Sequence, residues 1–197
     1  MKTAISRKII SLGLAVLSFI CITSCSGGSE KAPDAVFSGK TSTKNFGDFS
    51  VVYPSEWNEV VDIEAESAEY SENFFEATSA FGEDNLCSSF QLTKAAETNK
   101  NQLRSLIKQD DIPQIVSQFQ QTYGTDVKLE SSSFYKIDGK QCLNYELSFE
   151  KNDASYIISQ TYFIQNRCVY ILTVTAVNGI DEENALNIPL SLSFGDD

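Results

Sequence analysis

The stretch RCVYILTVTAV, residues 167–177, is apolar at both sets of alternating positions. The two sets hold Cys168, Tyr170, Leu172 and Val174 on one side and Val169 and Ile171 on the other. Side chains alternate between the faces of a strand, so a strand that is apolar on both faces is buried on both. We therefore predict that this segment is a central strand of a sheet covered on both sides.

Further strands are expected on the N-terminal side of this segment. SYIISQTYFIQ (155–165) is a second β-rich run, and Asp138-Gly139 is a strong two-residue hairpin signal between two alternating runs. The apolar positions of those two runs are Val127, Leu129, Tyr135 and Ile137, then Leu143, Tyr145, Leu147 and Phe149. Residues 73–94 predict another hairpin around residues 82–85, and residues 46–60 predict a strand, a turn at Pro54 and the start of a second strand.

Two helices are expected between these groups of strands. Residues 97–109 place Leu103, Leu106 and Ile107 on one helical face. A second helix begins after Asp111-Ile112-Pro113 and ends at Gly124. Its apolar residues are Ile112, Ile115, Val116, Phe119 and Tyr123. The expected fold class is α+β, an antiparallel β-sheet flanked by helices.

The first 24 residues have the pattern of a secretory signal peptide. Lys2, Arg7 and Lys8 precede the uncharged stretch 9–22, which has the length of a signal-peptide core. A helix that crosses the bilayer needs about 20 apolar residues, so this stretch is too short to span it.

The end of this leader resembles the lipobox of bacterial lipoproteins through Ile22, Thr23, Ser24 and Cys25. The resemblance implies that Cys25 becomes the N-terminus and carries a lipid that anchors the protein to a membrane. The expected location is the bacterial cell envelope, facing outside the cytoplasm. An ordinary leader cleaved near Ser24 or Ser26 is the alternative.

The expected domain organisation is a signal peptide (1–24), a flexible tether (25–45) and one domain (46–197). The tether prediction rests on the Gly and Ser residues at 26–29 and on the lack of strong periodicity before Phe46.

Composition excludes several classes of function. Without residues 1–24, 12 of the 15 Lys and Arg remain against 27 Asp and Glu, a net charge of −15. Nucleic-acid binding normally needs a basic patch and is disfavoured. The chain has no histidine, which removes Ser-His-Asp catalysis and His-containing zinc sites. We expect neither a cofactor nor a metal site.

Three cysteines, Cys87, Cys142 and Cys168, remain in the predicted domain. Cys142 and Cys168 fall on strands with one strand expected between them, which puts them beyond disulfide reach. A disulfide, if one forms, should therefore join Cys87 to either Cys142 or Cys168. The favoured interpretation is that all three are small buried side chains.

The candidate binding residues have weak signals. The carboxylates of an acidic cluster could hold Ca²⁺, although a solvated surface is the favoured interpretation. The cluster consists of Glu64, Glu66, Glu69, Glu72 and Glu76. Tyr53, Trp57 and Tyr70 could line a cleft, although Trp57 is expected in the core. Lys140 is expected to be a solvated hairpin residue.

Several of these segments together resemble the PsbP-like proteins of the Mog1/PsbP superfamily, which includes DcrB-like lipoproteins. The matching features are Y-P-x-x-W (53–57), I-D-G-K (137–140), TYFIQNRCVYILTVTA (161–176) and SLSF (191–194). The resemblance implies a Mog1/PsbP-like sandwich and a role that depends on binding rather than catalysis. Fold alone does not transfer a particular role.

The favoured hypothesis is a lipid-anchored extracytoplasmic binding or assembly module without catalytic activity, acting through a protein partner. A small-ligand or cation-binding lipoprotein is the alternative. An extracytoplasmic hydrolase is less favoured, because no nucleophile and base are placed together by the sequence.

Overall fold

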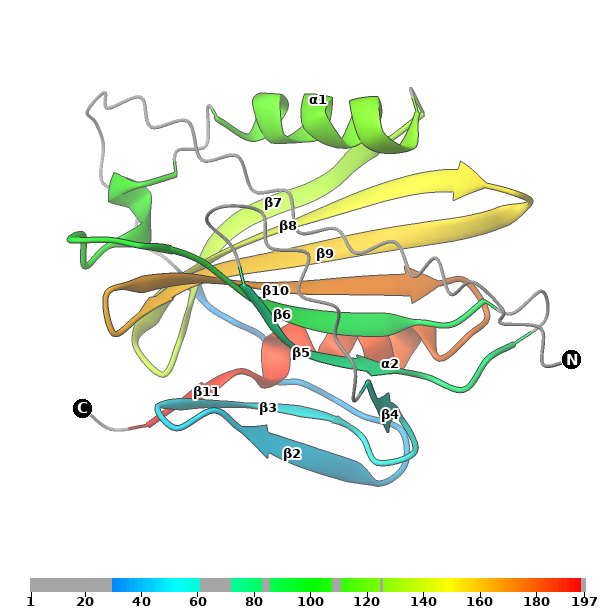
Figure 1. Cartoon of the computed structure of the whole chain (residues 1–197), viewed down its shortest axis with the longest axis horizontal. Coiled ribbons are helices and arrows are strands. Elements are labelled where there is room, and N and C mark those ends of the chain that lie inside the picture. The colour runs from blue at the N-terminus through cyan, green and yellow to red at the C-terminus, as the bar shows by residue number, and fades with distance from the viewer. Residues whose placement is uncertain (1–29, 61–71, 83–85, 108–110, 125, 196–197) are drawn as a thin grey trace, which may run out of the picture.

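The computed structural model describes residues 30–60, 72–82, 86–107, 111–124 and 126–195. Within these ranges a large twisted sheet forms the middle layer, with α1 (Ile112–Tyr123) on one side and a small sheet on the other (Figure 1). The large sheet has the order β1-β7-β8-β9-β10-β6-β5-β4. Its strands are β1 (Glu30–Lys31), β4 (Asn58–Glu59), β5 (Glu72–Thr78), β6 (Ser89–Glu97), β7 (Lys128–Ile137), β8 (Lys140–Lys151), β9 (Ala154–Gln165) and β10 (Cys168–Val177).

β10 is the central strand that the sequence predicts. It pairs antiparallel with β9 on one side and β6 on the other. Leu172 and Val174 are fully buried against the small sheet, and Ile171 is buried on the opposite face. The two apolar alternations of residues 167–177 therefore contribute to two different cores.

β7, β8, β9 and β10 form a continuous antiparallel meander. Each connection is a two-residue turn with positive φ at both positions, namely Asp138-Gly139, Asn152-Asp153 and Asn166-Arg167. Such turns match the twist of the paired strands, which is why glycine, asparagine and aspartate are favoured there. The Asp138-Gly139 hairpin is confirmed.

The small sheet and α2 (Glu182–Asn187) cover one face of the large sheet. The small sheet has the order β11-β3-β2, with β2 (Thr41–Asn45), β3 (Phe49–Pro54) and β11 (Ser193–Phe194). Phe163 on β9 lies at the centre of this interface, 5.0 Å from the ring of Phe49 and 5.3 Å from that of Phe194. A 3₁₀ turn, η4 (Pro189–Ser191), links α2 to β11.

The opposite face is covered by α1 (Ile112–Tyr123) and the 3₁₀ turn η2 (Leu103–Ser105). α1 begins and ends as predicted, and Gly124 at its C-cap has φ of 117°. The predicted helix over 97–109 is wrong. β6 continues to Glu97, and the described part of this segment contains only η2, which still buries Leu103 and Ile107. A single 3₁₀ turn is enough to bury these side chains.

The predicted tether over 25–45 also requires correction, because residues 30–45 are part of the fold. β1 pairs in parallel with β7, and β2 pairs with β3. Between them, the Ser38 amide donates to Oδ1 of the buried Asn184 at 2.8 Å. These contacts are distant in sequence, so the local composition of residues 30–45 does not reveal them.

A buried polar row crosses five strands on the α1 side of the large sheet. It consists of Tyr145, Gln160, Thr173, Gln91 and Glu76, each directly opposite the next. None of the five is more than 8% exposed. The Gln160 amide donates to Thr173 Oγ1 at 3.0 Å, and the hydroxyls of Tyr145 and Tyr162 donate to Gln160 Oε1. These hydrogen bonds give the buried side chains of Tyr145, Gln160 and Thr173 their polar partners.

Glu76, at the end of this row, provides a pH-dependent prediction. Burial raises the pKa of its carboxyl above the usual 4.5, so the folded state favours the protonated form. Its contribution to stability is complete below the unfolded pKa and is lost as the pH rises through the folded pKa. Glu76→Gln should therefore raise the thermal unfolding midpoint at about pH 8 and change it little at about pH 4.

Thermal unfolding of the wild type and of the Glu76→Gln variant at the two pH values measures this difference in the unfolding midpoint. Glu97→Gln is the control, because Glu97 is exposed at the end of β6. An equal gain at both pH values would show that the charge of Glu76 is not the cause.

The three cysteines are free thiols. Cys142 lies on β8 and Cys168 on β10, with β9 between them as predicted. Burial raises the pKa of the Cys142 thiol to about 12.

Within the described ranges, no helix has both the length and the apolar character needed to cross a bilayer.

Candidate functional site

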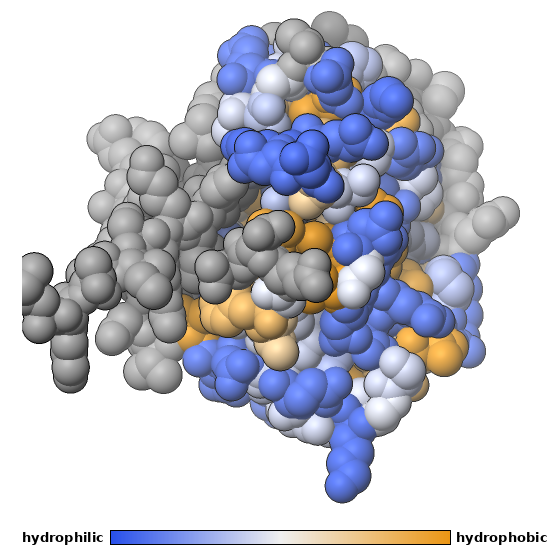
Figure 2. Space-filling model, turned by 90° about the vertical axis from the view of Figure 1, so that its right-hand side faces the viewer, coloured by the Kyte–Doolittle hydropathy of each residue, from blue (hydrophilic) through white to orange (hydrophobic). Residues whose placement is uncertain are grey.

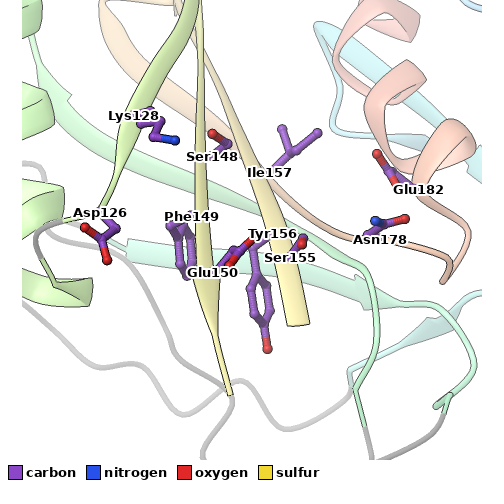
Figure 3. Close-up of a pocket in the computed structure, with 10 residues that line it drawn as sticks. All are labelled: Asp126, Lys128, Ser148, Phe149, Glu150, Ser155, Tyr156, Ile157, Asn178 and Glu182. Carbon is purple, nitrogen blue, oxygen red and sulfur yellow. The ribbon is translucent and has the colours of Figure 1, made fainter. Parts of the chain in front are cut away.

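A groove of about 510 Å³ lies at the end of the large sheet where β8 turns into β9 (Figure 3). Its lining residues are Asp126, Lys128, Ser148, Phe149, Glu150, Ser155, Tyr156, Ile157, Asn178 and Glu182. Figure 2 looks onto this end of the molecule, where hydrophobic residues show as patches between hydrophilic ones. The groove is open to solvent, with polar groups around a partly apolar floor.

Strand register gathers the floor residues from β7, β8 and β9. Lys128 lies opposite Ser148, and Ser148 lies opposite Ile157, so these three side chains form one row (Figure 3). Glu150 and Ser155 form the next pair toward the Asn152-Asp153 turn. Because alternate residues share a face, all five lie on the face opposite Phe149.

An aromatic stack on the α1 side of the sheet, the face opposite these five residues, forms the other wall of the groove where it passes around the end of the sheet. The ring of Phe149 lies 4.8 Å from that of Tyr123 on α1 and 5.0 Å from that of Tyr156 on β9. Phe149 is buried, while Tyr123 and Tyr156 are half-buried. Burial also raises the pKa of the Tyr156 hydroxyl above its usual 10.0. The stack fixes the wall in place and leaves part of Tyr156 available for contact.

The rim of the groove is acidic. Asp126, Glu150 and Glu182 supply three carboxylates against the single ammonium of Lys128. The two ion pairs in the described ranges, Lys31–Asp34 and Lys44–Glu59, lie elsewhere. The groove therefore offers hydrogen-bond acceptors, a negative potential and an aromatic surface, which are the elements of a binding site.

The aromatic residues that the sequence suggested for a cleft lie in the core. Trp57 is 5% exposed, as predicted, and its indole N–H donates to Asp181 Oδ2. Tyr53 is buried beside Phe90 and donates its hydroxyl hydrogen to Glu59 at 2.8 Å. Tyr70 lies outside the described residues.

Only part of the predicted acidic cluster lies within the described residues. Glu64, Glu66 and Glu69 lie outside the described residues, and Glu72 is described only through its place in β5. Glu76 is buried, so the solvated-surface interpretation is wrong for this residue. The described residues contain no group of three or more acidic, cysteine or histidine side chains suited to a metal ion.

Lys140 is more enclosed than the sequence predicts. It is half-buried, donates to Gln165 Oε1 at 2.5 Å and lies 5.5 Å from the centre of the Phe194 ring. Lys140 therefore helps to join β8, β9 and β11 and is not a freely solvated turn residue.

The groove itself was not predicted from the sequence. Its residues come from four separate segments, and their juxtaposition depends on the β8–β9 register. Asn152-Asp153, a two-residue turn signal between alternating runs, is the sequence feature that could have fixed this register.

Comparisons with known proteins support the fold. The solution structure of cyanobacterial PsbP (CyanoP) from Synechocystis sp. PCC 6803 matches with a TM-score of 0.57 and 13% identity. The match covers 88% of this chain and 98% of that chain. The domain therefore has a PsbP-like α+β fold, which confirms the prediction.

Two other solved structures match more distantly. LpqN, involved in cell envelope biogenesis of Mycobacterium tuberculosis, has 14% identity and a TM-score of 0.45, covering 80% of this chain and 91% of that chain. A crystal structure from Bacteroides thetaiotaomicron VPI-5482 has 17% identity and a TM-score of 0.42. This match covers 81% of this chain and 49% of that chain. No protein-family model and no curated protein matches the sequence.

Proposed function

We propose that the protein is a lipid-anchored, extracytoplasmic binding module without catalytic activity, acting through a protein partner. The leader pattern ending at Cys25 supports the anchor and the location in the bacterial cell envelope. The PsbP-like fold is consistent with the binding role that the family resemblance implies.

The observation that carries the proposal is the open groove at the β8–β9 end of the sheet. It combines an aromatic wall with three carboxylates on an accessible rim. Partner recognition uses such aromatic surfaces for contact area and rim charges for orientation. A catalytic site would instead need a nucleophile and a base held together with a stabilising group.

The anchor is tested by Cys25→Ser in the native host. The unmodified protein should float with membranes and incorporate a radiolabelled fatty acid, whereas C25S should lose both properties. Two or three buried acyl chains hold a protein stably, so the expected loss is nearly complete. Cys87→Ser is the matched control. Equal flotation and labelling of C25S would refute the lipid anchor.

The partner is tested with a photo-crosslinking amino acid at Ser155. Ser155 is exposed in the groove, and Ser105, which is exposed on η2, serves as the control position. Ser105 belongs to the opposite end of the sheet, because the amide of its neighbour Arg104 donates to Gln141 at the start of β8. We expect a discrete protein adduct from position 155 that is absent from position 105.

Charge reversal provides the second arm of this experiment. Glu150→Lys and Glu182→Lys should each weaken the adduct at position 155, whereas Glu97→Lys on β6 should not. If position 155 gives no protein adduct although the protein is intact in the membrane, the partner model is rejected.

A small-ligand lipoprotein is the second candidate, favoured by the groove volume. About 510 Å³ lies within the range of roughly 300–1,000 Å³ that is usual for ligand pockets. Native mass spectrometry of protein purified from its own membranes would then show a bound mass in addition to the lipidated chain. Ser155→Trp should weaken retention of that mass, because the indole takes up part of the groove.

A further inference from the structure

The α1 side of the large sheet has an apolar half and a polar half. Over β8 and β9 its side chains are mostly apolar, and Leu143, Leu147 and Ile158 belong to the same core as residues of α1 and η2. In Figure 1 α1 lies beside β7, away from β5 and β6. Over most of β5 and β6 and the C-terminal part of β10 the side chains on this face are polar. Strand register brings together Glu76, Thr78, Ser89, Gln91, Thr173 and Thr175.

Glu76 and Gln91 are the two members of this polar half whose side chains lack partners. Glu76 is 7% exposed, and Gln91, directly opposite on β6, is also buried. In the described part of the chain, the Glu76 carboxyl makes no hydrogen bond or ion pair, and the Gln91 amide has no hydrogen-bond partner either. Buried polar groups in folded proteins are nearly always hydrogen-bonded, to the protein or to something bound to it.

These two groups are recessed and not sealed. Among the described residues, only Nε of Arg104 is both shut off from solvent and without a hydrogen-bond partner. The unpaired polar atoms of Glu76 and Gln91 therefore keep some contact with solvent. We call the surface formed by the six residues above the polar recess. None of the six lines the groove, so the polar recess is a separate place on the molecule.

The polar recess offers hydrogen-bond acceptors and no positive charge from its own strands. Its acceptors are a carboxyl, a carboxamide oxygen and hydroxyls. Lys94, the one basic residue of β5, β6 and β10, lies opposite Tyr170 and so belongs to the other face of the sheet. The residues that the structure describes provide no set of three acidic, cysteine or histidine ligands here. An organic cation therefore suits the polar recess better than a metal ion, which needs more ligands.

We propose that the polar recess binds a small organic molecule that carries an ammonium group, held between the carboxylate of Glu76 and the carboxamide oxygen of Gln91. Side chains directly opposite each other in a sheet have Cβ atoms about 4.5–5.5 Å apart, so one ammonium with three N–H donors reaches both. The hydroxyls of Thr78 and Ser89, the next opposed pair, are left for the rest of the ligand. The ligand supplies the positive donors that these strands lack. Binding here requires neither the lipid anchor nor the groove.

Ethanolamine is a suitable probe, because it combines an ammonium with a hydroxyl. Full-length protein is unfolded by heat at neutral pH and constant ionic strength with increasing ethanolamine. At about five times its dissociation constant, the ligand should raise the unfolding midpoint by about 2–4 °C, and the shift should saturate as binding does. Ethylene glycol, with a hydroxyl in place of the ammonium, should leave the midpoint unchanged.

Substitutions in the polar recess locate the binding. Glu76→Gln removes the charge and keeps the shape, so this variant should lose the saturable shift. Glu97→Gln is the matched control, because Glu97 is exposed at the end of β6 and its variant should keep the shift. Gln91→Met removes one acceptor at nearly constant length and should weaken the apparent affinity about tenfold.

Three outcomes decide the proposal. A saturable shift in the wild type and in E97Q that E76Q lacks supports the site. No saturable shift in the wild type would show that water alone satisfies Glu76, and the proposal would be overturned. An equal shift in E76Q would also overturn it, and its loss in Glu150→Gln would then place the ammonium on the acidic rim of the groove.

Discussion

Phe163→Ala should lower the free energy of unfolding by about 3–5 kcal/mol, the range for removing a buried aromatic side chain. Phe163 is fully buried and contacts the rings of Phe49, Tyr170 and Phe194. It therefore joins the large sheet to β3 and β11 of the small sheet. Alanine would leave a cavity between the layers that surrounding residues cannot fill without moving the sheets.

Chemical denaturation monitored by circular dichroism measures this loss. Phe81→Ala is the matched control, because Phe81 is 53% exposed and the same atoms are removed. A change within about 0.5 kcal/mol is expected there. Similar small losses for both variants would show that Phe163 does not link the layers as described.

Asp181→Ala should lower the free energy of unfolding by about 2–4 kcal/mol, through two separate effects. The Asp181 carboxylate accepts hydrogen bonds from the Trp57 indole and, at 2.6 Å, from the Asn184 amide. Trp57 is 5% exposed, so its N–H would lose its partner in a dry environment. Asp181 also has φ of 51°, a conformation that alanine adopts at a cost and aspartate tolerates better.

Two further variants separate these effects. Asp181→Gly relieves the backbone strain but still leaves Trp57 unpaired, while Asp181→Asn keeps an acceptor oxygen and a residue that tolerates positive φ. The expected order of stability is wild type, then D181N, D181G and D181A. Trp57 is the chain's single tryptophan, so its emission reports the change directly. D181N as unstable as D181A would contradict the role of the hydrogen bond.

The C-terminal half of the fold was predictable because its signals are local. Alternation along 155–165 and 167–177 defines β9 and β10, and Asp138-Gly139 supplies the turn before β8. Antiparallel neighbours joined by two-residue turns need no long-range information beyond the turn itself. Consecutive strands in this part of the chain are therefore adjacent in space.

The N-terminal segment was mispredicted because its structure depends on distant partners. Thr41–Asn45 is polar and half-exposed, and it is held as β2 by pairing with β3. The Ser38 amide is held by Asn184, which is 146 residues away. Composition alone suggests flexibility for such a segment, since its own side chains bury little surface.

The predicted helix over 97–109 failed for a different reason. Leu103, Leu106 and Ile107 have helical spacing, but a single 3₁₀ turn also directs them toward the core. The Thr98 amide donates to the Arg167 carbonyl, which extends the pairing between β6 and the β9–β10 turn. Sheet pairing thus uses residues that a helix would need for its first turn.

The groove and the buried polar row depend on register across strands. Gln160 and Thr173 appear as isolated polar residues in apolar runs, and only the β9–β10 pairing places them opposite each other. The same holds for Lys128, Ser148 and Ile157 in the groove. Register is specified by which face is buried, information that a single strand does not contain.

The pairing of β11 with β3 has a consequence for biosynthesis. Phe194 lies opposite Phe49, so the small sheet joins residues near the two ends of the domain. Its third strand, β11, follows every other described strand in the sequence, so it is synthesised after them. A nascent chain that ends before residue 193 therefore leaves the backbone edge of β3 at Phe49 and Ser50 unpaired, and this edge is completed only after the large sheet has been synthesised.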